Sequence, residues 1–118
     1  MLKLKRAYEP AAPSDGRRIL VDRLWPRGVS KSKLSIAEWA KEVAPSAELR
    51  RWFAHDPKKW PEFRRRYKRE LRAQSDLVDR FARIARRQRL TLVFGARDEA
   101  HNDAVVLAEV IRRRMTRP

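Results

Sequence analysis

Two short segments of this chain hold side chains of the types that can bind anionic molecules and transfer protons. The first, residues 22–28, contributes a carboxylate, an indole and two guanidinium groups: Asp22, Trp25, Arg23 and Arg27. The second, residues 95–103, contributes Arg97, Asp98, His101, Asn102 and Asp103. Guanidinium groups and the free N–H groups at a helix start both favour phosphates and carboxylates, which predicts a site for a small phosphate- or nucleotide-like anion. The expected ligand-binding residues are Arg23, Trp25, Arg27, Arg97 and Asn102.

A hydrolase-type reaction is a further expectation for the same two segments. Asp22, Asp98 and His101 are the candidate catalytic residues, because carboxylates and imidazoles transfer protons in enzyme sites. Each has a structural alternative that stays open: Asp22 as the partner in an ion pair, Asp98 as a helix cap and His101 as a solvated side chain. Trp25 equally fits a buried plug. The sequence does not decide whether the chain is an enzyme.

No pattern in the sequence is typical of a metal or cofactor site. The chain has no cysteine and only two histidines, which lie far apart in the sequence. It also lacks the P-loop, the glycine-rich dinucleotide fingerprint and the nucleophile elbow of esterases. We therefore expect no metal and no cofactor. The missing motifs also count against a kinase-type protein, a dinucleotide-binding protein and an esterase.

Short strands alternating with helices are expected to position the two segments. Residues 2–8 alternate apolar and basic side chains, and residues 19–21 and 90–94 are runs typical of buried strands. Strands separated by helices pair in parallel, which predicts an α/β fold with a small, mainly parallel sheet of about three to four strands. About four helices would cover it in a Rossmann-like three-layer arrangement. Both segments follow a strand, so we expect them to meet at the carboxyl edge of the sheet.

Helical patterns occupy most of the remaining chain. Ser46 can cap a helix that ends near Phe53. Apolar residues at helical spacing predict further helices over residues 62–71, 77–85 and 104–111. Residues 36–43 fit a strand or a single helical turn equally well.

The charge of the chain suggests an alternative function. There are 30 lysine and arginine residues against 15 aspartate and glutamate residues, a formal net charge of +15. Such an excess favours polyanions, because each neutralised phosphate releases counterions. The alternative function is therefore nucleic-acid binding by the helical region 58–89. The same charges also fit a solvated helical surface that binds nothing specific. The residues expected at that face are Arg64, Arg65, Arg66, Lys68, Arg69, Arg83 and Arg87.

The length of the chain fits a single domain over residues 1–118. No apolar run approaches the ~20 residues that span a bilayer, so no membrane partner is expected. The absence of cysteine and of an apolar leader segment favours a cytoplasmic location. The oligomeric state is not predicted.

The string Val-Asp-Arg-Leu-Trp-Pro-Arg-Gly at residues 21–28 resembles a known family. It is similar to the YeaO-like proteins, a bacterial family of unknown function also called DUF488. Residues 14–16, 39–50 and 90–107 are similar to the same family, so the resemblance spans nearly the whole chain. It implies a compact cytoplasmic α/β domain with a pocket formed between two loops.

The chain departs from this family at the start of the last helix. Members usually have Asn-His-Ala where this sequence has Asn102-Asp103-Ala104, and its own histidine is His101. If the family histidine is catalytic, this chain either has lost that function or uses His101 in its place. A shift of one residue turns a helical side chain by ~100°, so the two positions are not equivalent.

Overall fold

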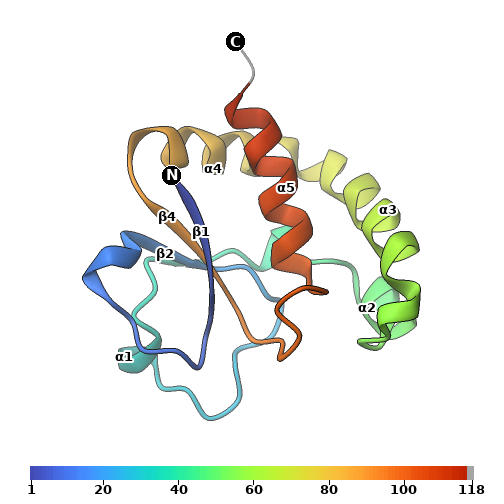
Figure 1. Ribbon diagram of the computed structural model, residues 1–118, viewed down its shortest axis with the longest axis horizontal. Helices are drawn as coiled ribbons and strands as arrows, with labels where there is room; N and C mark the ends of the chain where they lie inside the picture. Colours follow the sequence, from blue (N-terminus) through green and yellow to red (C-terminus); the bar gives the residue numbers. More distant parts are fainter. Residues whose placement is uncertain (117–118) are drawn as a thin grey trace.

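A four-stranded, all-parallel sheet forms the centre of the molecule, in a computed structural model that describes residues 1–116 (Figure 1). The strands are β1 (Leu2–Arg6), β2 (Arg17–Leu20), β3 (Glu38–Trp39) and β4 (Leu90–Phe94). Their order across the sheet is β1-β4-β2-β3, and each neighbouring pair is parallel. Every residue of β4 is buried, as expected of a strand with neighbours on both edges and layers on both faces.

Three long helices cover one face of this sheet. The helices of the chain are α1 (Lys31–Leu34), α2 (Ala47–Phe53), α3 (Trp60–Leu71), α4 (Ser75–Arg87) and α5 (Asp103–Met115). Helices α3 and α4 follow each other in an arc, and α5 lies across β1 and β4 (Figure 1). Their apolar sides share one core with the sheet, in which Phe81, Ile111 and Leu92 have no exposed surface. Burial of these continuous apolar stripes is the main stabilising contribution to the fold.

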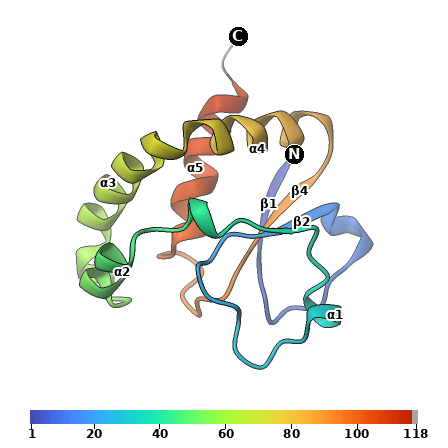
Figure 2. The ribbon, with the colours of Figure 1, turned by 180° about the vertical axis from the view of Figure 1, so that it is seen from behind.

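The connection between β2 and β3 covers the opposite face (Figure 2). It carries the short α1, and Leu34 from this helix packs with Leu20 and Val93 of the sheet. Trp25 and Trp39 pack edge to face in the same layer, with ring centroids 5.3 Å apart. The third layer of the molecule is therefore made mainly of irregular chain.

A fully buried carboxylate fastens this second face to the N-terminal strand. Asp15, which has no exposed surface, lies in the short turn Pro13–Asp15. It forms ion pairs with Lys3 at 2.7 Å, Lys5 at 3.0 Å and Arg18 at 2.7 Å. Burial raises the pKa of Asp15, but the hydrogen bonds from these cations and from the Ala12 N–H lower it further, to well below its usual range. The carboxylate therefore stays charged and ties strand β1 to β2.

The structure confirms the predicted fold class, a small parallel sheet with helical cover. Residues 36–43, which the sequence left open, contain both elements: strand β3 is followed by the 3-10 turn Lys41–Val43. Strand β1 ends at Arg6, two residues earlier than the alternation suggests, because the chain turns there and Arg6 N–H donates to the Glu9 carboxylate. Within residues 1–116, no helix has the length and apolar character needed to cross a membrane.

Candidate functional site

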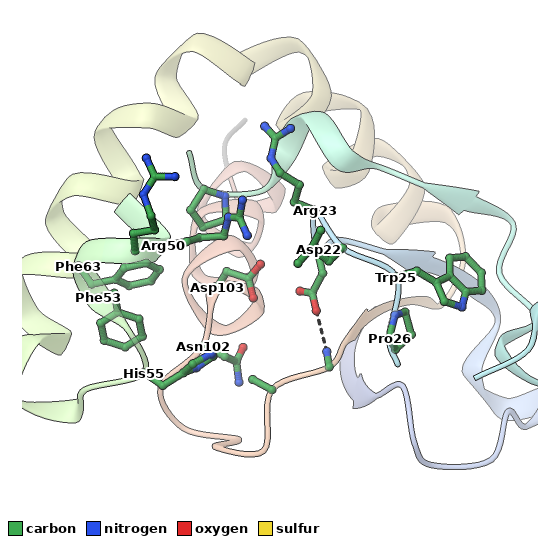
Figure 3. A pocket seen from close by; sticks show the side chains of 15 residues that line it. Asp22, Arg23, Trp25, Pro26, Arg50, Phe53, His55, Phe63, Asn102 and Asp103 are labelled. Carbon is green, nitrogen blue, oxygen red and sulfur yellow. Dashed lines mark hydrogen bonds between the residues drawn. The ribbon is translucent and has the colours of Figure 1, made fainter. Parts of the chain in front are cut away.

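The two chemistry-bearing segments meet at the carboxyl edge of the sheet, which confirms the predicted geometry. Asp22 follows β2 and Gly95 follows β4, and these strands are neighbours. The Gly95 N–H donates to Asp22 Oδ2 over 2.8 Å, which joins the two turns directly (Figure 3). A side chain on Gly95 would lie within 3.3 Å of the same oxygen, so the glycine permits this close approach.

A cavity of about 440 Å³ opens between these turns and helix α2 (Figure 3). Such a volume falls within the ~300–1,000 Å³ of small-molecule sites. Its lining combines carboxyl groups, cations and apolar side chains. The lining residues are Asp22, Arg23, Leu24, Trp25, Pro26, Pro45, Arg50, Arg51, Phe53, His55, Phe63, Gly95, Ala96, Asn102 and Asp103.

Two carboxyl groups face one another in this cavity (Figure 3). Burial raises the pKa of Asp103 well above its usual value, and both the charge of Asp22 and a hydrogen bond to it raise it further. Burial also raises the pKa of Asp22, although the Gly95 N–H, Asp103 and the Arg50 charge oppose this. Two carboxyls this close do not ionise independently: a proton on the pair is shared through the hydrogen bond between them, and the larger rise in pKa favours Asp103 as its donor.

Arg50 brings an unpaired guanidinium group to the same cavity. Its Nε is buried and has no hydrogen-bond partner within residues 1–116. Its positive charge acts on Asp22, yet it forms no ion pair with a described residue. A buried guanidinium donor without an acceptor is costly, and an anion is the acceptor that suits it best.

Helix α2 places Arg50 and His55 at the cavity. Ser46 caps the helix by accepting the Leu49 N–H at 3.2 Å, and its hydroxyl donates to Glu70 of α3 at 2.6 Å. The helix ends at two residues with left-handed backbone, Ala54 with φ 48° and His55 with φ 56°. Side-chain-bearing residues rarely adopt this conformation, and here it turns the chain so that His55 lines the cavity.

Four of the predicted site residues line this cavity: Asp22, Arg23, Trp25 and Asn102. Two of them also have structural roles. The Trp25 indole N–H donates to the Val29 carbonyl at 2.6 Å, which fixes the loop. Asn102 caps α5 by accepting the Val105 N–H at 3.1 Å, and its amide donates to the Asp98 carbonyl at 2.9 Å. Because both polar groups of Asn102 are engaged, Asn102 shapes the cavity and offers no free polar group to a ligand.

The other four predicted residues, Arg27, Arg97, Asp98 and His101, lie outside the lining of this cavity. Asp98 accepts the His101 N–H at 3.0 Å and contacts its Nδ1 at 2.9 Å. The hydrogen bond from His101 is the main cause that lowers the pKa of Asp98. The His101 ring packs edge-on against Trp60 at 5.2 Å. The helix-cap alternative for Asp98 is wrong, because Asn102 caps α5; the catalytic roles of Asp98 and His101 stay predictions.

Three residues that the sequence analysis did not select complete the site: Arg50, His55 and Asp103. The departure from Asn-His-Ala was a signal for Asp103, since it puts an acid where the family has a histidine. Arg50 gave no signal, because it lies on a helix in the middle of the chain. His55 precedes Asp56-Pro57, which predicts a turn but not its direction.

Acidic partners occupy four of the seven residues expected at a nucleic-acid face. Arg64 and Lys68 pair with Glu109, and Arg65 and Arg66 pair with Glu62. Arg69, Arg83 and Arg87 are exposed and form no ion pair with residues 1–116. Within the described residues 1–116, no group of three or more histidine or carboxylate side chains is arranged to hold a metal ion.

Residues 1–118 match the family model DUF488-N3i, described as the inactive DUF488-N3 subclade. Uncharacterized protein YeaO of Escherichia coli is 46% identical over 111 residues, which cover 94% of this chain and 96% of YeaO. Uncharacterized protein Rv3073c of Mycobacterium tuberculosis is 39% identical over 113 residues, covering 96% of this chain and 95% of that protein. No solved structure matches the chain.

Proposed function

This chain belongs to the DUF488 family, and we propose that it binds a small phosphate- or nucleotide-like anion in the cavity between residues 22–28 and 95–103. The observation that carries the proposal is the unpaired guanidinium of Arg50, whose buried Nε has no acceptor within residues 1–116. Two further cations, Arg23 and Arg51, line the cavity and are exposed. Together they supply the donors that an anionic group needs, and Phe53 adds an apolar wall.

Binding is favoured over a hydrolase-type reaction for two reasons. The subclade whose model matches this chain is described as inactive. At position 103 the chain has an aspartate where the resembled family has a histidine, and burial together with the Asp22 charge raises the pKa of this carboxyl well above its usual value. A carboxyl acts as a general base only after it has lost its proton, which a raised pKa makes less favourable. Asp22 already accepts the Gly95 N–H at 2.8 Å and a hydrogen bond from Asp103.

A thermal-shift measurement with a matched pair of variants tests this proposal. The probes are inorganic phosphate, ribose 5-phosphate and adenosine monophosphate. A probe at 100 times its Kd stabilises the folded state by about 2.7 kcal/mol, a rise in Tm of about 10 °C for a domain of this size. Arg50→Met should abolish the shift. Arg69→Met, which removes an exposed arginine outside the cavity, should leave it unchanged.

Two outcomes would refute anion binding at this site. One is that none of the three probes raises the Tm of the wild-type protein. The other is that Arg50→Met binds a probe as tightly as the wild type does. Hydrolysis of ribose 5-phosphate or adenosine monophosphate to free phosphate, measured on the same samples, would refute the assignment of a binding role without catalysis.

The ion pairs on α3 count against nucleic-acid binding as the main function. Glu62 and Glu109 form ion pairs with four of the seven expected contacts, and Arg69, Arg83 and Arg87 form none within residues 1–116. Three phosphate contacts on duplex DNA predict about a 40-fold loss of affinity between 50 and 200 mM salt, whereas six predict about 2,000-fold. Fluorescence anisotropy with a labelled duplex measures this slope directly. A slope that corresponds to six contacts would reinstate the alternative.

A further inference from the structure

We propose that the cavity takes its anion together with a proton, so that binding is strong only while Asp103 is protonated. This inference rests on the proposed function, because it concerns the anion that binds Arg50. It follows from the arrangement of charges: an unpaired cation and two carboxyl groups line one cavity. With one proton on the pair, the charges of Asp22 and Arg50 balance. Without it, two carboxylates face the single charge of Arg50, and the exposed Arg23 and Arg51 are the other cations in the lining.

The contacts of the two carboxyls show why the proton stays in the pair. Neither Asp22 nor Asp103 forms an ion pair with residues 1–116. Asp22 accepts one backbone N–H, from Gly95 at 2.8 Å. Asp103 Oδ1 accepts the N–H of Ala104 at 3.0 Å. Few backbone donors therefore serve the two carboxyls, and the hydrogen bond between them and the charges of Arg50 and His55 on Asp22 contribute the rest.

Other charged and titratable groups around the pair come from three elements. Helix α2 and the turn after it supply Arg50, Arg51 and His55, and the segment after β2 supplies Arg23. Helix α3 supplies Tyr67, on which the charges of Asp103, Asp22 and Glu70 act. Burial raises the pKa of Tyr67 well above its usual value, and its hydroxyl donates to the Val43 carbonyl at 2.6 Å, so it stays neutral. His55 also lines the cavity, and its charge lowers the pKa of Asp22.

The direction of the pH effect follows from these charges. Asp103 is neutral below its raised pKa, and an anion beside Arg50 then meets only the charge of Asp22. Above that pKa a second carboxylate faces the anion. At a separation of about 6 Å and an effective dielectric constant of about 20, one extra charge weakens binding about 100-fold. The affinity for an anion therefore falls as pH rises, and binding in that range takes up a proton.

Sulfate is the probe for the experiment, because its charge is constant between pH 5 and pH 9. Its Kd is measured across this range by NMR titration at fixed ionic strength. All proteins carry His55→Gln, which removes the imidazole that lines the same cavity and acts on Asp22. In this background we expect the affinity for sulfate to fall by up to about 100-fold from low to high pH. Adding Asp103→Asn, which keeps a donor to Asp22 but cannot ionise, should make the affinity independent of pH.

Calorimetry on the wild-type protein provides a second measurement that needs no variant. Sulfate titrations in two buffers of different ionisation enthalpy report the protons taken up on binding, and up to one proton per sulfate is expected at alkaline pH. The same pH dependence with and without Asp103→Asn, or no proton uptake, would overturn the inference and leave the anion site intact. Sulfate binding that is absent, or unaffected by Arg50→Met, would overturn the proposed function itself.

Discussion

Removing the charge of Asp15 should destabilise the protein more than any other single loss of an acidic group. Asp15 has no exposed surface, and Arg18, one of its partners, is 4% exposed. Asp15→Asn keeps the size of the side chain but leaves three cations, Lys3, Lys5 and Arg18, around a neutral amide. Taking one partner from a buried ion pair costs about 3–5 kcal/mol, because the other charge stays buried without compensation. Domains of this size are stable by about 5–15 kcal/mol.

Urea denaturation followed by tryptophan fluorescence measures this loss. With a dependence of about 1.5 kcal/mol per molar urea, a loss of about 4 kcal/mol lowers the midpoint by roughly 2–3 M. The control is Glu99→Gln, which changes an exposed acidic side chain in the loop before α5 and should move the midpoint little. A loss below about 1 kcal/mol for Asp15→Asn would show that the three cations do not depend on this carboxylate.

The stability that the Asp15 charge contributes should depend on pH in a definite direction. The pKa of Asp15 is lowered in the folded protein, so its charge contributes stability that is fully present above the unfolded value, about pH 4. That contribution is lost as pH falls toward the folded value. The difference in unfolding free energy between wild type and Asp15→Asn should therefore be constant from pH 5 to pH 8 and shrink below about pH 4. A difference that grows on acidification would refute this reasoning.

Three further substitutions test the positions where local geometry is most demanding, each by urea denaturation. Tyr67→Phe removes a hydroxyl that donates to the buried Val43 carbonyl at 2.6 Å and should cost about 1–2 kcal/mol. Gly16→Ala, at φ 64°, puts a Cβ 2.4 Å from the Arg89 carbonyl oxygen and should cost more than about 2 kcal/mol; Gly28→Ala, at φ 78° in open space, should cost about 1 kcal/mol. Ala54→Gly, at φ 48°, should stabilise by about 0.5 kcal/mol, because glycine adopts this conformation without strain. The glycine prediction is contradicted if Gly16→Ala lowers the free energy of unfolding no more than Gly28→Ala does. The other two are contradicted if Tyr67→Phe leaves the free energy of unfolding unchanged, or if Ala54→Gly lowers it.

The fold class could be predicted because the strands and helices leave clear local patterns. The alternation in β1 and the apolar run of β4 are properties of consecutive residues, and a parallel sheet follows once helices separate the strands. The face of the sheet that each helix covers could not be predicted in this way. An apolar stripe shows that a helix packs on something, but not on which side of the sheet. Placement of α3, α4 and α5 on one face depends on contacts between residues far apart in the chain.

The site was predictable only where it follows from strand order. Asp22 and Gly95 meet because the carboxyl ends of neighbouring parallel strands share an edge. Arg50 and His55 reach the same cavity through α2, whose position depends on the hydrogen bonds from Ser46 to Glu70 across to α3. No local pattern encodes such a contact. The prediction that His101 serves the cavity used its residue type and its place in the segment 95–103, whereas its side chain packs against Trp60.

The excess of positive charge makes unpaired arginines common in this chain, so the significance of Arg50 lies in its surroundings. The chain has 15 acidic residues for 30 basic ones, and many exposed arginines have no acid to pair with. Arg50 differs because two carboxyls line the same cavity and neither pairs with it within residues 1–116. The Gly95 N–H and the proton on Asp103 satisfy Asp22 in its place. If the cavity binds an anion as proposed, the acid at position 103 leaves the guanidinium to the ligand, because its hydrogen bond to Asp22 stabilises that carboxylate in place of Arg50.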